Sequence, residues 1–108
     1  MEKEISRKPY VTSDKFFESR SQVYNYGIHI FGYFQAERYN RIIEKAIEFH
    51  TAYPECRHLA TKKRMYRNII LDAHLIIYRI TDKRIEVLDI IHAASSIQKI
   101  RDVRKIRM

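Results

Sequence analysis

The sequence has 108 residues, of which 45% are hydrophobic and eight are Tyr, and its net charge is +8. This composition is typical of a folded chain and the length is typical of one domain, so we expect a single domain over residues 1–108. No apolar run is long enough to cross a bilayer, the first residues lack the apolar core of a signal peptide, and one Cys suits a reducing compartment, so we predict a cytoplasmic protein that does not enter a membrane.

The excess positive charge lies in the second half of the chain. Residues 1–56 contain eight Lys or Arg and eight Asp or Glu, whereas residues 57–108 contain thirteen and five, which leaves +8. This distribution favours an acidic partner, either nucleic acid or an acidic protein segment. A basic surface that is merely solvated is the alternative.

The first elements in chain order are a short strand and a helix. The stretch KPYVT at 8–12 is typical of a strand that begins at Pro9, and one of the polar residues at 12–14 can cap the helix that follows. This helix is predicted to end near Gly27 or Gly32. Its apolar side is formed by Phe16, Phe17, Val23, Tyr24 and Tyr26.

The stretch QAERYNRIIEKAIEFH at 35–50 is the clearest helix in the sequence. Its apolar residues recur at the spacing of one helical face, namely Ala36, Tyr39, Ile42, Ile43, Ala46, Ile47 and His50. The pair Tyr53-Pro54 should end it, because a residue before Pro is pushed out of helical geometry. The first half is therefore predicted to form a helical hairpin.

Three stretches rich in β-branched residues follow, at 67–71, 74–80 and 84–92. The connections between them are so short that the strands must be antiparallel neighbours. The middle strand is apolar on both faces, so we expect it to be central, with the helical hairpin over one side. The predicted fold class is α+β: an N-terminal strand and helical hairpin packed on an antiparallel β-meander.

The last residues predict a short amphipathic helix. Ser95 followed by Gln98 matches a capping box, and apolar residues recur every three positions from Ile97 to Ile106. Five of the last ten residues are Lys or Arg. So short a helix must dock on something, either its own sheet or another molecule.

The loop at 57–67, RHLATKKRMYR, is the candidate nucleic-acid-binding segment. It contains five Lys or Arg and no acid, so it could follow a phosphate backbone while a tyrosine ring stacks on a base. A solvated loop is the alternative. The candidate residues are Arg57, Lys62, Lys63, Arg64, Tyr66 and Arg67, with Arg79 on the neighbouring strand.

Other candidates have simpler explanations beside the functional ones. His92 at a strand end could act as a general acid or base, but such a His is more often hydrogen-bonded in place. His74 is expected to pack or to make an edge hydrogen bond. Arg67 could bind phosphate or pair with Asp89 across the sheet. The spacing of Cys56 and the nearby histidines fits no ordinary zinc pattern, so we predict no metal and no cofactor.

The sequence YRNIILDAHLIIYRITDKRIEVLDIIHAASS at 66–96 resembles the RelE/ParE superfamily of toxins from bacterial type II toxin–antitoxin systems. That family has an Arg before a hairpin, a strand ending in Tyr-Arg, and a last strand that finishes in His. Arg67, Tyr78, Arg79 and His92 stand at these positions here. The order of elements in the first half agrees, and the resemblance covers about residues 8 to 96.

This resemblance implies a toxin that a cognate, acidic antitoxin binds and neutralises, so that oligomers form mainly with the antitoxin. RelE-like members cleave messenger RNA on the ribosome, whereas ParE-like members inhibit DNA gyrase without catalysis. Members that cleave RNA usually carry Arg, Lys or Tyr just after the last strand, where this chain has Ala93 to Ser96.

Because residues 57–67 are dense in cations, the sequence slightly favours a metal-independent endoribonuclease. Its predicted catalytic residues are Arg67 for the phosphate, Tyr78 as proton donor and His92 as base. Gyrase inhibition, and a non-toxic basic protein of the same fold, are the alternatives.

Overall fold

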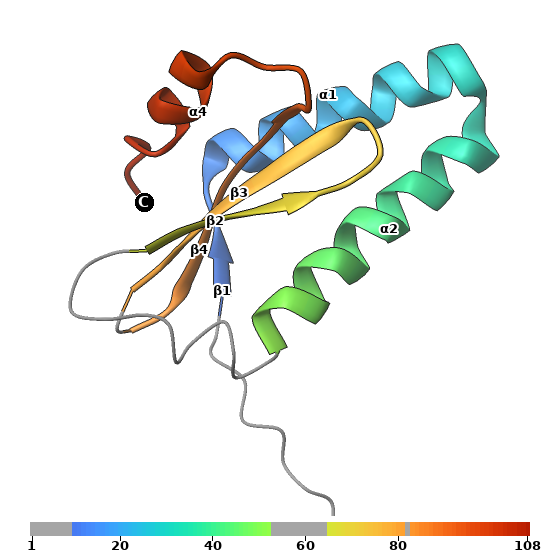
Figure 1. Ribbon diagram of the computed structural model, residues 1–108. Coiled ribbons are helices and arrows are strands. Elements are labelled where there is room, and N and C mark those ends of the chain that lie inside the picture. Colours follow the sequence, from blue (N-terminus) through green and yellow to red (C-terminus); the bar gives the residue numbers. More distant parts are fainter. Residues whose placement is uncertain (1–9, 53–64, 82) are drawn as a thin grey trace, which may run out of the picture.

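The computed structural model describes residues 10–52, 65–81 and 83–108 (Figure 1). Within these ranges the chain forms four strands and three helices. In chain order they are β1 Tyr10–Thr12, α1 Asp14–Phe31, α2 Tyr33–Ala52, β2 Met65–Ile70, β3 His74–Ile80, β4 Ile85–His92 and α4 Ile97–Val103. The α+β class, the helical hairpin and the C-terminal helix are therefore confirmed.

The four strands form one mixed sheet in the order β1-β4-β3-β2. Strands β2, β3 and β4 are consecutive antiparallel neighbours, as the short connections predicted, whereas β1 pairs in parallel with β4. Both β3 and β4 are thus central, and seven of the eight residues of β4 are buried. A register shift between Ile77 and Tyr78 marks a bulge in the β3–β4 pairing.

Each face of the sheet has its own apolar core. On one face α1 and α2 bury Phe16, Ile43 and Ile47 against side chains such as Ile76 and Ile90. On the opposite face Val103 of α4 packs with a second set of side chains, formed by Leu75, Ile77, Leu88 and Ile91. Figure 1 shows the hairpin and α4 on opposite sides of the strands. Two helical covers of one sheet therefore hold the domain together.

Ser13 joins the first helix to the centre of the sheet. Its hydroxyl oxygen accepts a hydrogen bond from the backbone N–H of Phe16 at 2.9 Å and so caps α1. The same hydroxyl donates to the backbone carbonyl of Leu88 in β4 at 2.5 Å. Since Ser13 is buried, both bonds are shielded from water. One side chain thus fixes where α1 begins and how it lies against β4.

A single residue connects the two helices of the hairpin. Gly32 ends α1 by donating its N–H to the carbonyl of Ile28, and its own carbonyl accepts from the N–H of Ala36 in α2. Its φ of 91° lies in a region that L-residues with a side chain rarely adopt. Gly32, of the two glycines considered, is therefore the residue that ends the first helix.

The C-terminal helix docks on the chain's own sheet. Its cap is Ser96, whose side chain accepts from the N–H of Lys99 at 3.1 Å. The prediction of Ser95 as the cap is wrong by one residue, because the N–H of Ser95 instead closes a turn onto the carbonyl of His92. Ile100 and Ile106 flank the buried Val103 against the sheet. This face of the helix is what the spacing of its apolar residues predicted.

We expect Ser13→Ala to lower the free energy of unfolding by about 1–3 kcal/mol, because it removes the cap of α1 and leaves the buried carbonyl of Leu88 without its donor. Ser96→Ala is the matched control. Ser96 caps α4 in the same way but is exposed, so water can replace it and the loss should be smaller. Urea unfolding of both variants checks this, and equal losses would contradict the anchoring role of Ser13.

Candidate functional site

The three predicted catalytic residues do not form one site in this structure. Arg67 and Tyr78 are directly opposite each other on β2 and β3, whereas His92 lies opposite His74 at the other end of β3. Four residues of strand separate His74 from Tyr78, which is about 13 Å at the usual rise of a strand. Tyr78 is also only 3% exposed, within the core beneath the hairpin. A substrate phosphate therefore cannot contact all three side chains.

The predicted nucleic-acid-binding residues fall into two groups. Arg57, Lys62, Lys63 and Arg64 lie outside the described residues. Tyr66 and Arg79, which are opposite each other on β2 and β3, lie on the face that α4 covers. The guanidinium carbons of Arg79 and Arg104 lie 5.9 Å and 5.2 Å from the centre of the Tyr66 ring. The tyrosine ring is thus in contact with cations of the chain itself.

The charge of Arg79 is satisfied within the protein. Arg79 is 4% exposed, and its Nε donates to Oε1 of Glu86 at 2.7 Å. The other carboxylate oxygen of Glu86 accepts from Nε of Arg84 at 3.0 Å. Burial would raise the pKa of Glu86, but the hydrogen bonds and charges of the two arginines outweigh it and lower that pKa. Arg79 therefore has a structural role between β3 and β4.

The same cluster holds the end of α4. The backbone carbonyl of Arg104 accepts from the hydroxyl of Tyr66 at 3.2 Å and from Nη1 of Arg79 at 3.4 Å. These donors lie next to the apolar contacts of Val103, so polar and apolar contacts fix the helix together. The sequence did not predict this role for Tyr66 and Arg79, because it depends on contacts between residues 25 and 38 positions apart.

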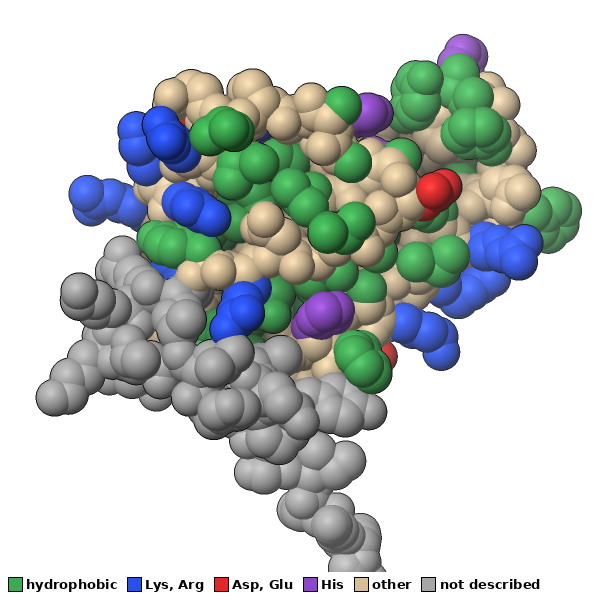
Figure 2. Space-filling model, in the orientation of Figure 1, with side chains coloured by type: hydrophobic (Ala, Val, Ile, Leu, Met, Phe, Trp, Pro, Cys, Tyr) green, Lys and Arg blue, Asp and Glu red, His purple; other side chains and the backbone are tan. Residues whose placement is uncertain are grey.

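The outer side of α4 and the residues after it form an exposed basic surface. Lys and Arg side chains gather there in Figure 2, around the C-terminal end. Asp102 is the single acid of residues 97–108, and it accepts from Gln98 and lies 3.9 Å from Nζ of Lys105. We call this set the α4 basic surface; its exposed members are Lys99, Arg101, Arg104, Lys105 and Arg107.

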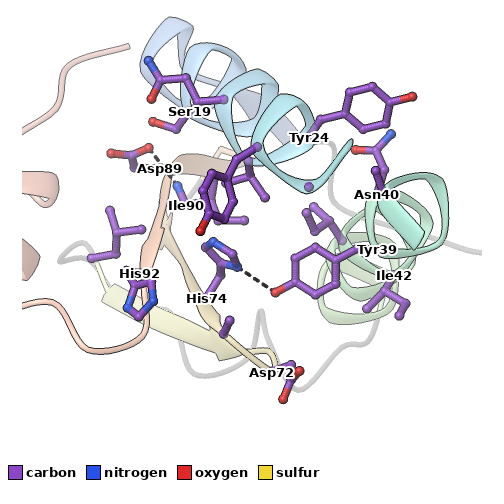
Figure 3. Close-up of a pocket in the computed structure, with 18 of the residues that line it drawn as sticks. Ser19, Tyr24, Tyr39, Asn40, Ile42, Asp72, His74, Asp89, Ile90 and His92 are labelled. Carbon is purple, nitrogen blue, oxygen red and sulfur yellow. Dashed lines mark hydrogen bonds between the residues drawn. The ribbon is translucent and has the colours of Figure 1, made fainter. Parts of the chain in front are cut away.

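A cavity of about 790 Å³ lies between the helical hairpin and the ends of β3 and β4. Tyr39 of α2 and His74 of β3 meet in it, where the tyrosine hydroxyl and Nδ1 of His74 are 2.8 Å apart (Figure 3). The ring of His92 lies 5.9 Å from the ring of His74, and Nδ1 of His92 accepts from the N–H of Ala94. Apolar side chains such as Val23 and Ile90 complete the wall.

The hydrogen bonds around this cavity test the sequence predictions for His74 and His92. His74 makes a hydrogen bond, as expected, although its strand is central and the partner comes from the hairpin. His92 is hydrogen-bonded in place by the turn that follows it, which was its simpler interpretation. Tyr39 was predicted as part of an apolar helix face, and nothing in the sequence indicated that its hydroxyl would reach a residue 35 positions away.

The local environment shifts the pKa values of His74 and Tyr39. Burial, and after it the nearby ring of His92, lower the pKa of His74 below its usual value of 6.5. Burial likewise raises the pKa of Tyr39, so the tyrosine stays neutral. The cavity therefore favours the uncharged forms of both hydrogen-bonded side chains.

We expect the free energy of unfolding to decrease as pH falls below about 6.5, because the unfolded chain then takes up a proton at His74 before the folded chain does. His74→Gln should flatten part of this dependence, since an amide can bond Tyr39 without titrating. Burial also lowers the pKa of His50, so His50 should still contribute to the pH dependence of the His74→Gln variant. Urea unfolding at pH 7.5, 6.5 and 5.5 measures the effect.

Among the described residues no helix combines the length and apolarity needed to cross a membrane. The same residues include no group of three His, Cys, Asp or Glu side chains arranged to hold a metal ion.

Comparison with known proteins identifies the fold and the family. A chain from the chromosomal ParDE TA system of P. aeruginosa is similar in structure, with a TM-score of 0.61 and 14% identity over 80% of this chain and 96% of that chain. No curated protein matches the sequence. A family model described as the ParE toxin of the type II toxin–antitoxin system parDE matches residues 10–97, from the start of β1 to the first residue of α4. The chain therefore belongs to the ParE toxin family of type II toxin–antitoxin systems.

Proposed function

We propose that this toxin inhibits DNA gyrase by binding to it and that it does not cleave RNA. The observation that carries the proposal is the separation of Tyr78 and His92, together with the burial of Tyr78. Membership of the ParE toxin family supports the same mode of action, because ParE-like members of the superfamily act on gyrase.

Metal-free RNA cleavage makes demands that the arrangement of the predicted catalytic residues does not favour. It needs a base, a cation at the phosphate and a proton donor, all within hydrogen-bond reach of one reacting group. The hydroxyl of Tyr78 belongs to a side chain buried beneath α2, and the guanidinium of Arg79 is bound to Glu86. Of the predicted set, Arg67 remains a partly exposed cation with no ion pair among the described residues. Binding to a protein target requires no convergence of this kind.

Ribosome-dependent cleavage of messenger RNA is the second candidate. The density of cations at 57–64 favours it, since Arg57, Lys62, Lys63 and Arg64 follow one another closely in sequence without an acid after Arg57. These residues lie outside the described part of the chain. Gyrase inhibition damages DNA whereas the nuclease cleaves messenger RNA, so induction of the toxin in cells distinguishes the two activities.

Induction of the full-length chain without antitoxin should produce DNA damage signalling while messenger RNA stays intact. With purified gyrase and plasmid DNA, the chain should reduce supercoiling, and His92→Gln should keep at least half of that effect. Cleaved transcripts, together with loss of toxicity in His92→Gln, would overturn the proposal in favour of the nuclease. Normal growth on induction would favour a non-toxic protein of the same fold.

Arg67→Ala should weaken toxicity more than Arg107→Ala. Arg67 lies on β2 and follows the cationic stretch in the sequence. It has no ion-pair partner among the described residues, so a target molecule can use its charge. Arg107 lies after α4, beyond the family-matched residues. Growth curves at matched expression measure the difference, and equal effects would count against a site on the sheet.

Family membership also implies a cognate antitoxin, and we propose that it has an acidic segment that covers the α4 basic surface. Residues 97–108 carry five cations against one acid, and all five cations are exposed. A segment rich in Asp and Glu would gain favourable electrostatic contacts there, and these weaken as salt rises. The apolar side of α4 stays occupied by the sheet, so this binding needs no rearrangement of the core.

Arg101→Glu combined with Lys105→Glu should reduce antitoxin affinity by roughly tenfold or more at low salt, because two favourable contacts become repulsive. Lys45→Glu combined with Lys83→Glu changes the net charge equally, but at exposed positions on α2 and in the β3–β4 turn. Titration calorimetry of both double variants measures their affinities for the antitoxin. If both double variants lose affinity equally, net charge rather than the α4 basic surface guides the antitoxin.

A further inference from the structure

The end of the helical hairpin carries an exposed apolar surface that nothing in the described structure covers. Phe34 is 85% exposed, and Tyr33 packs edge-on against it with ring centres 5.8 Å apart. Figure 2 shows hydrophobic side chains gathered over this end of the hairpin. We call this set the hairpin tip; it consists of Ile28, Ile30, Phe31, Tyr33 and Phe34, all of them exposed.

The same stretch is free of formal charge along the chain. No Asp, Glu, Lys or Arg occurs at positions 21–36, although 31% of all residues are of these types. An apolar surface kept clear of charge is typical of a protein contact, since single exposed apolar residues on ordinary surfaces are mixed with charged ones.

The backbone holds these side chains in a fixed arrangement. Gly32 is the single residue between α1 and α2, so the angle between the two helices at the tip is fixed. Just before the tip the helices approach closely, because a Cβ added at Gly27 would lie 3.4 Å from the Cβ of Ala36. Both helices are hydrogen-bonded through the turn itself. The tip is therefore a rigid surface, which lowers the entropy cost of binding.

We propose that the hairpin tip is a self-association surface, at which two copies of the toxin form a symmetric dimer. Phe34 and Tyr33 of each copy meet their counterparts across a two-fold axis. This inference does not depend on the target of the toxin, and it goes beyond the oligomers that form with an antitoxin.

Electrostatics favour a second copy over an acidic partner at this place. Two chains of charge +8 repel each other wherever their basic surfaces meet, and the tip lies within a stretch of sixteen residues, 21–36, that carries no formal charge. A two-fold contact uses one patch twice, so an uncharged apolar patch is complementary to itself. An acidic segment finds no Lys or Arg among residues 21–36, whereas the α4 basic surface offers it five cations.

The size of the tip fits a weak dimer. The exposed parts of three aromatic and two isoleucine side chains amount to roughly 600 Å² per copy, taking about 200 Å² for a whole side chain. Stable interfaces bury about 800 Å² per partner, so the tip lies slightly below that size. We expect a dimer that dissociates on dilution and that tightens as salt screens the repulsion between the two copies.

The test measures the mass of the full-length, antitoxin-free chain by sedimentation equilibrium over about 1–200 μM, a range suited to micromolar dissociation constants. The expected result is a shift from monomer towards dimer with rising concentration, enhanced at higher salt. Phe34→Glu should raise the dissociation constant by about 30-fold or more, as expected for loss of an aromatic residue at the centre of an interface. Ile70→Glu is the matched control, because Ile70 is 78% exposed on β2 and should have no effect.

A mixing experiment separates loss of contact from loss of fold. Phe34→Glu and Phe34→Lys should each be monomeric, because like charges then face each other across the two-fold axis. An equimolar mixture should recover the dimer mass, since opposite charges meet. A native chain that stays monomeric at all concentrations, or a Phe34→Glu variant that still dimerises, overturns the proposal. Co-sedimentation of a monomeric native chain with phosphatidylcholine vesicles also overturns it and assigns the tip to a lipid surface.

Discussion

Strands β3 and β4 are apolar on both faces, and burying both faces is the constraint on which the rest of the structure depends. A sheet with two apolar faces needs two covers, because each exposed isoleucine forfeits about 1.5–3 kcal/mol of burial free energy. The hairpin covers one face and α4 covers the other. The basic C-terminal segment is therefore part of the folded domain, and its cations are exposed because its apolar side is already occupied.

Most of the architecture could be predicted because it depends on local patterns. The face of α2 followed from the spacing of residues such as Ile43 and Ile47, and the antiparallel strands followed from connections too short for any other arrangement. The parallel pairing of β1 with β4 could not be predicted, because the three residues of β1 pair with residues 75 positions later. The cap of α4 was misplaced by one residue because Ser95 and Ser96 are chemically equivalent and the turn after His92 selects between them.

The site was less predictable than the fold. Sequence patterns identify Tyr78, Arg79 and His92 as chemically capable side chains but do not say whether they are free to act. The structure places Tyr78 in a core, binds Arg79 to Glu86 and hydrogen-bonds His92 to its own turn. Each of these outcomes depends on contacts that form only when the sheet is assembled. The positions of the superfamily motif thus take part in tertiary contacts that the motif alone does not reveal.

The pairing of β1 with β4 has a consequence for how the chain acquires its structure. The first strand and Ser13 remain without their partners until Val87 and Leu88 have been synthesised, because the strand pairing and the hydrogen bond of the Ser13 hydroxyl both link the beginning of the domain to its last strand. Such long-range closure slows folding compared with a chain of local contacts. The first strand therefore cannot join the sheet until β4 has been made, and α1 lacks its anchor on the sheet throughout the synthesis of the residues between them.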